Sequence, residues 1–350
     1  MTALTAQLDL ASAALGGVVM AANDETCAAK ENLLRPEAPA PGAGGPGSDA
    51  WATRHRHEPG DDWALVRLGE PGVISTLVVD TSHCGGNSPR TAAVQACTVE
   101  GYPGPTALLD PRTPWTTLLP PTPLSADTPN AFDVQDPHRY THVRLRISPD
   151  GAVARLRVHG HVVPDPRLLA TGRTDLAAQE NGAVVLDHSG NLDPHRPPAL
   201  TAPGPPTHPG HGWAPPRRRD EGNDWVQLRL VEEGLVRQVE VDTRFCPGTA
   251  PAQIALYGMN ATTAALHEPG TWFEILPPTA VQPDTRHRYP VSTDRPATHV
   301  RLDALPHGGL ARLRLWGELT PAGAARVTRH WEQTGPASAQ APAPEAAAAA

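Results

Sequence analysis

Apolar and polar residues alternate along several short stretches of the chain, a pattern typical of β-strands with one buried face. In residues 153–158 (Val-Ala-Arg-Leu-Arg-Val), the arginines share one face and alternate with apolar residues on the other. Residues 311–315 repeat this alternation, and residues 143–147 and 73–80 also alternate. Short strands of this kind predict an antiparallel β-sandwich or jelly roll.

The same strand patterns occur twice along the chain. Residues 63–68 (Trp-Ala-Leu-Val-Arg-Leu) return as residues 225–230 (Trp-Val-Gln-Leu-Arg-Leu), and Cys84 returns as Cys246 at the same spacing. The interval is far too long for a solenoid unit, so each copy is expected to be a domain with its own core.

The two copies set the predicted domain bounds. We place the first repeat at residues 8–161 and the second repeat at residues 175–318. Residues 162–174 contain prolines and are predicted to form a linker. The Pro, Ala and Ser-rich residues 336–350 are predicted to be a disordered tail.

Composition narrows the class of protein. The 350 residues include 41 prolines, 31 glycines and only 4% aromatic residues, which favours short strands and many turns over long helices. The net charge of −8 argues against a nucleic-acid or anionic-membrane partner. Four cysteines, no convincing signal peptide and no span-length apolar stretch indicate reduced thiols and a cytoplasmic protein. An interdomain Cys84–Cys246 bridge is the less favoured alternative.

Several polar blocks in the first repeat resemble the allantoicase family. The blocks are residues 23–25 (Asn-Asp-Glu), 30–34 (Lys-Glu-Asn-Leu-Leu), 51–56 (Trp-Ala-Thr-Arg-His-Arg), 80–83 (Asp-Thr-Ser-His) and 150–157 (Asp-Gly-Ala-Val-Ala-Arg-Leu-Arg). The resemblance covers both repeats in order. It implies two tandem jelly-roll domains with a galactose-binding-like all-β fold. It also implies hydrolysis of allantoate to ureidoglycolate and urea in purine breakdown through allantoin.

The two repeats depart from the family pattern to different degrees. In the first repeat, Ala52 replaces the family's glutamate after the block's tryptophan. In the second repeat, Trp213 is followed by Ala-Pro-Pro, and the Asn-Leu-Leu block is lost. The second repeat has therefore kept its strand cores and lost polar loop residues, so the first repeat is the predicted location of the site.

Two carboxylates and two arginines of the first repeat are the main candidates for chemistry. Allantoate carries one carboxylate and two ureido groups, so release of urea requires proton transfer and a group that binds the carboxylate. Asp24 and Glu25 are predicted to be catalytic, on their match to the family block. Arg54 and Arg56 would share one face of an extended segment and could hold a carboxylate. The structural alternatives are a turn cap and a solvated sheet surface.

Five further polar residues complete the predicted site. His83 follows a strand that ends in a carboxylate and is predicted to be an acid–base group; the second repeat has phenylalanine there. Asn23, Lys30, Asn32 and Asn87 are predicted to bind the substrate. The structural alternatives are capping residues for the asparagines and a surface-loop position for the histidine.

Other residues are expected to serve the fold. His142 and Cys84 recur in the second repeat as His299 and Cys246, so neither is predicted to be catalytic. His55 and His57 have the spacing of a metal-chelating pair on a strand. The family resemblance points to arginine at these two positions, so no metal ligand and no cofactor are predicted. Metal dependence is left open.

Two non-enzymatic functions remain as alternatives. One is a small-ligand or sugar-binding protein with tandem jelly rolls, and the other is a degenerate paralogue that mainly assembles with a partner. Sugar-binding loops usually present aromatic side chains, which are scarce here. We therefore predict an enzyme whose partner is a small molecule, and leave open whether it is a homo-oligomer.

Overall fold

The computed structural model describes most of the chain as two compact units. One unit is made mostly of residues 17–158 and the other mostly of residues 159–333. The described residues are 7–41, 49–191, 199–209, 211–263 and 270–335. The predicted tail, residues 336–350, lies outside them, and the predicted domain and linker bounds stay predictions.

The first repeat forms an eight-stranded sheet in the order β1-β10-β4-β8-β5-β6, and β2 and β7 also pair with β4. A separate two-stranded sheet joins β3 to β9. The strands are β1 (Leu8–Asp9), β2 (Val18–Ala22), β3 (Trp51–Ala52), β4 (Asp62–Asp80), β5 (Thr91–Cys97), β6 (Thr116–Pro123), β7 (Pro129–Asp133), β8 (Arg139–Ser148), β9 (Ala152–Val153) and β10 (Arg155–Val162).

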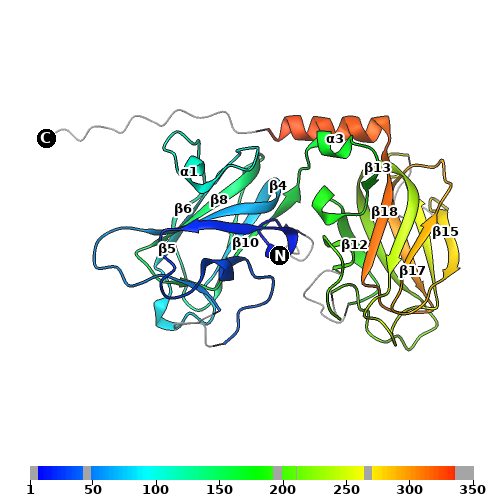
Figure 1. Cartoon of the computed structure of the whole chain (residues 1–350), viewed down its shortest axis with the longest axis horizontal. Coiled ribbons are helices and arrows are strands. Elements are labelled where there is room, and N and C mark those ends of the chain that lie inside the picture. The colour runs from blue at the N-terminus through cyan, green and yellow to red at the C-terminus, as the bar shows by residue number, and fades with distance from the viewer. Residues whose placement is uncertain (1–6, 42–48, 192–198, 210, 264–269, 336–350) are drawn as a thin grey trace. The chain divides into compact units, whose positions relative to one another are not determined.

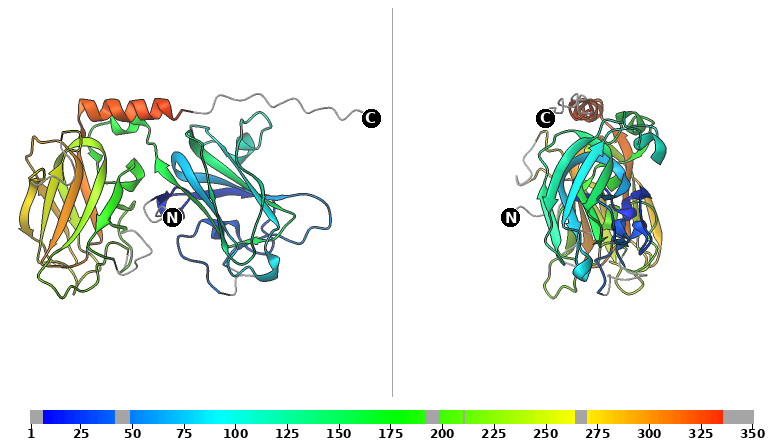
Figure 2. Two further views of the ribbon diagram at one scale, coloured as in Figure 1. Left: turned by 180° about the vertical axis from the view of Figure 1, so that it is seen from behind. Right: turned by 90° about the vertical axis from the view of Figure 1, so that its left-hand side faces the viewer.

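The second repeat has the same topology. Its sheet has the order β11-β18-β13-β17-β14-β15, and β12 and β16 also pair with β13 (Figures 1 and 2). The strands are β11 (Thr174–Asp175), β12 (Val184–His188), β13 (Asp224–Asp242), β14 (Gln253–Met259), β15 (Phe273–Ala280), β16 (Arg286–Pro290), β17 (Ala297–Leu305) and β18 (Arg312–Leu319). The predicted all-β fold of two tandem jelly-roll domains is confirmed.

One long strand organises each repeat. The first half of β4 pairs with β2 and β8, and its last five residues pair with β7. The strand β13 changes its partners in the same way, from β12 and β17 to β16 and β18. The predicted alternation holds at matching positions, because Leu77, Val79, Val239 and Val241 are all fully buried. These side chains face the core of their own repeat.

Helices are short except near the C-terminus. They are η2 (Ala13–Leu15), η3 (Lys30–Leu34), η4 (Gly85–Asn87), α1 (Pro105–Leu108), α2 (Pro166–Leu169), η5 (Gln179–Asn181), η6 (Ala199–Thr201) and α3 (Pro321–Gln333). Helix α3 packs on β13 (Figure 1). Gly323 lies against the backbone of Glu233, and NH2 of Arg326 lies 3.2 Å from the side-chain carboxylate of Glu233. None of the helices in the described ranges has the length and hydropathy needed to cross a membrane.

Small residues draw the polar blocks of the first repeat together. A cluster of buried residues joins segments that are far apart in the sequence, and it consists of Ala28, Ala50, Ala52, Cys84, Ala152 and Ala154. Their short side chains let the backbones approach closely, as shown by the pairing of β3 with β9 and the bridge between Ala28 and Ala52. The blocks that begin at residues 23, 51, 80 and 150 are therefore neighbours in space.

Gly151 is the tightest point of this arrangement. Its φ of +142° lies in the region that favours glycine, and a Cβ atom there would be 2.6 Å from the carbonyl oxygen of Asn87. Any side chain at this position would push η4 away from the turn that precedes β9. The second repeat keeps the feature, because Gly308 has a φ of +146° and the same kind of backbone contact.

Substituting Gly151 tests this packing. Gly101→Ala is the matched control, because Gly101 also has a positive φ but has open space around the added Cβ. We expect Gly101→Ala to cost about 1 kcal/mol of unfolding free energy from backbone strain, and Gly151→Ala to cost about 1–3 kcal/mol more from overpacking. Urea unfolding measures both variants. Equal losses would contradict the close approach at Gly151.

Candidate active site

Asn23 fixes the start of the first polar block to strand β4. Its Oδ1 accepts a hydrogen bond from the backbone N–H of Trp63 at 2.7 Å, and its Nδ2 donates to Asp62 Oδ1 at 2.9 Å. In the second repeat, Ser189 makes the equivalent contacts with the start of β13 through its hydroxyl. The contacts of Asn23 thus belong to a feature that both repeats share.

Asp24 is a buried anchor for the turn around it. Its Oδ1 accepts hydrogen bonds from the backbone N–H groups of Thr26 at 2.9 Å and Arg54 at 3.2 Å. Its Oδ2 lies 3.0 Å from Nε of Arg54, whose side chain is 75% exposed. Burial raises the pKa of Asp24, but these hydrogen bonds and the charge of Arg54 outweigh it and lower the pKa. The carboxylate is therefore ionised and already fully engaged.

The Glu25 side chain is accessible to solvent, unlike that of Asp24, because it remains 44% exposed. Lys30 Nζ lies 3.0 Å and 3.2 Å from the two carboxylate oxygens of Glu25, and 2.9 Å from Glu31 Oε1. The hydrogen bond with Glu31, opposed by burial and reinforced by Glu25, raises the pKa of Lys30. A protonated lysine thus orients the Glu25 carboxylate while leaving it accessible.

An open cavity lies beside these residues. Its volume is about 480 Å³, and its lining consists of Glu25, Thr26, Ala28, Ala29, Asn32, Arg35 and Asp49. This volume is within the range of small-molecule sites. Asn32 is 6% exposed and its Nδ2 donates to the carbonyl oxygen of Ala50 at 2.8 Å, so it also ties η3 to the segment before β3.

Asp49 and Arg35 were not predicted from the sequence. Asp49 Oδ1 lies 2.7 Å from NH1 of Arg35, and its Oδ2 lies 2.7 Å from NH2 of Arg155. Burial raises the pKa of Asp49, but the bonds to Arg155, the Ala40 N–H and Arg35 lower it overall. A difference between the repeats could have indicated Asp49. It stands two residues before Trp51, whereas His211 stands two residues before Trp213 in the second repeat.

Arg54 and Arg56 pair with different carboxylates. Both follow strand β3, which ends at Ala52. Arg56 is 29% exposed, and its NH1 lies 2.6 Å from Asp62 Oδ1, whereas Arg54 pairs with Asp24. Because Arg218 and Asp224 form the corresponding pair in the second repeat, at 3.4 Å, the partner of Arg56 is a property of the fold.

His83 is the last residue of the block at 80–83 and Asn87 follows it, and neither is among the residues that line the cavity. His83 has a φ of +61°, and its N–H donates to Asp127 Oδ1 at 2.6 Å. Phe245 has a φ of +63° and the same kind of bond, to Asp284, at 2.9 Å. The backbone corner is therefore common to both repeats, while the exposed imidazole occurs only in the first. Asn87 is exposed at the end of η4.

The residues predicted to serve the fold have buried environments. Burial and the charge of Asp80 raise the pKa of the Cys84 thiol to about 11. Burial, together with Arg67, lowers the pKa of His142 to about 4, and its Nδ1 lies 2.8 Å from the neighbouring Thr141 hydroxyl. At neutral pH the thiol stays protonated and the imidazole stays neutral, which suits neither for nucleophilic or acid–base chemistry.

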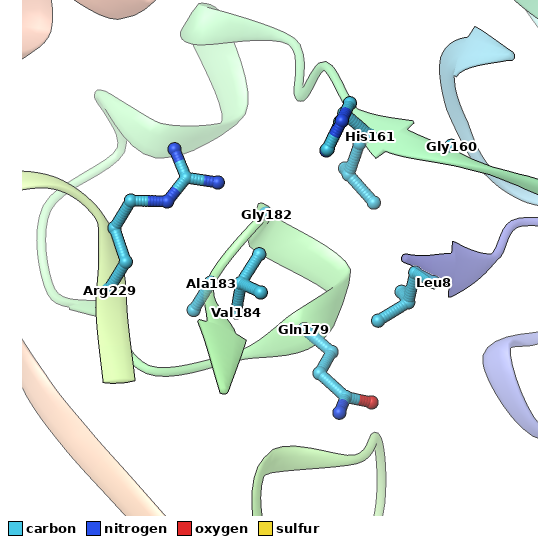
Figure 3. A pocket seen from close by; sticks show the side chains of 9 residues that line it. Leu8, Gly160, His161, Gln179, Gly182, Ala183, Val184 and Arg229 are labelled. Atoms are coloured by element: carbon cyan, nitrogen blue, oxygen red, sulfur yellow. The ribbon is translucent and has the colours of Figure 1, made fainter. Parts of the chain in front are cut away.

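Another cavity, lined in part by His161, Gln179 and Arg229, is too small for a substrate. Its volume is about 20 Å³, which is room for a single water molecule. Figure 3 shows the side chains of Arg229, His161 and Gln179 around it. Across the described part of the chain, no group of three or more His, Cys, Asp or Glu side chains is arranged to hold a metal ion. His55 and His57 meet edge to face, with ring centres 5.7 Å apart.

Comparisons with known proteins place both repeats in one family. The allantoicase repeat model matches residues 8–163 and 174–320. A probable allantoicase from Nocardia farcinica is 49% identical over 320 residues, covering 89% of this chain and 94% of that protein. The allantoicase of Dictyostelium discoideum is 35% identical, covering 88% of this chain and 86% of that protein.

A solved structure agrees with the sequence comparisons. The crystal structure of allantoicase from Saccharomyces cerevisiae is similar to this chain with a TM-score of 0.76 and 30% identity. The similarity covers 89% of this chain and 92% of the yeast chain. Sequence and structure thus agree over both repeats, and this chain belongs to the allantoicase family.

Proposed function

We propose that this protein is an allantoicase, which hydrolyses allantoate to ureidoglycolate and urea in the degradation of allantoin. The observation that carries the proposal is the match of both repeats to the allantoicase model, together with 49% identity to a probable allantoicase over nearly the whole chain. The open cavity among the polar blocks of the first repeat supports a small-molecule substrate.

The reaction defines what the site must provide. The bond between the central carbon of allantoate and one ureido nitrogen breaks, and a bond from that carbon to the water oxygen forms. Water loses one proton to a base, and the leaving urea nitrogen gains one from an acid. A single accessible carboxyl group beside the reacting bond can accept the first proton and return it to the leaving group.

Glu25 is the residue that we propose for this proton transfer. It lines the cavity, its side chain is 44% exposed, and Lys30 holds both of its carboxylate oxygens. The Trp213 indole donates to the Gly190 carbonyl as the Trp51 indole donates to that of Asp24, so Asn191 holds the place of Glu25. An asparagine cannot exchange protons in this way, which limits the proposed chemistry to the first repeat.

The other candidates take supporting roles in this proposal. Asp24 orients the turn that carries Glu25, because both of its carboxylate oxygens are engaged by Thr26 and Arg54. Lys30 and Asn32 position the cavity wall. The roles of Arg54, Arg56, His83, Asn87 and Asn23 in binding or catalysis stay predictions. We also propose a cytoplasmic location, which four free cysteines support. Assembly into a homo-oligomer stays open.

A direct assay tests the proposed activity. Purified protein incubated with allantoate should release urea and ureidoglycolate in equal amounts. Because we predict no metal ligand among the site residues, turnover should continue at the same rate after treatment with a chelator. Release of neither product would contradict the function, and loss of turnover only with chelator would contradict the metal-free site.

Replacing Glu25 by glutamine tests its role separately. The variant keeps the size of the side chain and removes the titrating group, so kcat should fall by about 10²–10⁴-fold. Glu31→Gln is the matched control, because Glu31 is the other carboxylate partner of Lys30 and its side chain is 64% exposed. Thermal unfolding confirms that both variants are folded. A folded Glu25→Gln variant with the kcat of the control would rule out this assignment.

A further inference from the structure

Arg35 provides the positive charge of the cavity. Of the described residues that line the cavity, it is the one cation, and Glu25 and Asp49 are the anions. It directly follows η3, which is fixed by the buried side chains of Leu33 and Leu34, so its backbone is held in place. Its own side chain remains 54% exposed, and its NH1 lies 2.7 Å from Asp49 Oδ1.

Asp49 can release Arg35 without losing its ionic partner. The second oxygen of Asp49 accepts hydrogen bonds from Arg155 NH2 at 2.7 Å and from the Ala40 N–H at 3.1 Å. Arg155 is 1% exposed and is fixed by several backbone carbonyls. Arg35 is 54% and Asp49 is 19% exposed, and ion pairs near the surface contribute little net stability. Little stability is therefore lost if the guanidinium of Arg35 exchanges Asp49 for another carboxylate.

The second repeat shows that this pair is not required by the fold. Arg312 donates to the carbonyl of His211 as Arg155 donates to the carbonyl of Asp49, so His211 holds the position of Asp49. The buried arginine is present in both repeats, whereas a histidine stands at the position of Asp49 in the second. The pair of Arg35 with Asp49 is thus an addition to the shared framework, because it needs this carboxylate.

We propose that Arg35 binds the carboxylate of allantoate and thereby selects for a carboxylate-bearing substrate. The planar guanidinium can form two parallel hydrogen bonds with a carboxylate, which gives both affinity and orientation. Asp49 holds the guanidinium at the cavity until the substrate arrives, and Glu25, which lines the same cavity, is left to act at a ureido group. This inference rests on the proposed function.

The test compares two substrates and three variants. The substrates are allantoate and its methyl ester, which keeps both ureido groups and lacks the negative charge. Arg35→Gln should raise KM for allantoate by roughly tenfold to a hundredfold, as expected for loss of a charged hydrogen-bonded contact. Its kcat should change by less than about threefold, and its preference for allantoate over the ester should disappear. Arg35→Lys should show an intermediate KM, because the charge remains without the planar fork.

Arg112→Gln is the matched control. Arg112 is also an exposed arginine that pairs with an aspartate, Asp110, at 2.8 Å, and it is not among the residues that line the cavity. This variant should retain the wild-type KM and substrate preference. Thermal unfolding of each variant shows whether it is folded, and the lysine variant serves if the glutamine variant is not.

The outcomes separate the two proposals. If the wild-type protein turns over allantoate but folded Arg35 variants keep its KM and its preference over the ester, the role of Arg35 is wrong and the proposed function stands. A fall in kcat with unchanged KM also contradicts carboxylate binding. If the wild-type protein turns over no allantoate, the proposed function fails and the inference fails with it.

Discussion

The buried guanidinium of Arg155 is the interaction on which the candidate site depends. A cation that is 1% exposed is tolerated only when its donors are satisfied, and Arg155 donates to the carbonyls of Glu37, Ala38 and Asp49 and to the Asp49 carboxylate. These bonds attach both ends of the segment between η3 and β3 to strand β10. Together with the buried residues of η3 and the hydrogen bond from Asn32 to Ala50, this side chain holds the segment that carries Arg35 and Asp49.

The second repeat shows which part of the interaction belongs to the fold. Arg312 occupies the same place and donates to the carbonyls of Ala199, Gly204 and His211. Burial, with a smaller effect of Arg314, lowers the pKa of Arg312 to about 10. A buried arginine that ties a loop to the last long strand is therefore common to both repeats, whereas Asp49 of the first repeat is replaced by His211 in the second.

The sequence predicts the fold well because the fold is recorded in local patterns. Alternation such as that of residues 153–158 identifies strands, and the duplication identifies two domains, both confirmed by matching sheet topologies. The contrast between the repeats also favours the block that contains Glu25 as part of the site. One detail differs from the pattern, since Arg155 lies on the polar face of its strand and is nevertheless buried by the segment that ends at Asp49.

The site is less predictable because its contacts connect residues that are distant in the chain. Asp49 and Arg155 are 106 positions apart, and nothing in the local sequence around either residue indicates the pair. Asp24 shows the opposite limit. Its match to a family block favours catalysis, whereas one of its carboxylate oxygens accepts hydrogen bonds from backbone N–H groups and the other pairs with Arg54. A motif identifies which residues matter, and only the three-dimensional contacts distinguish a positioning role from a chemical one.

We infer that one of the two similar domains carries the site. The most direct measurement is a crystal structure of the Glu25→Gln variant soaked with allantoate. We expect one substrate molecule per chain, bound in the cavity of the first repeat with its carboxylate at Arg35. Substrate bound at the loops of the second repeat, or in both repeats alike, would contradict it.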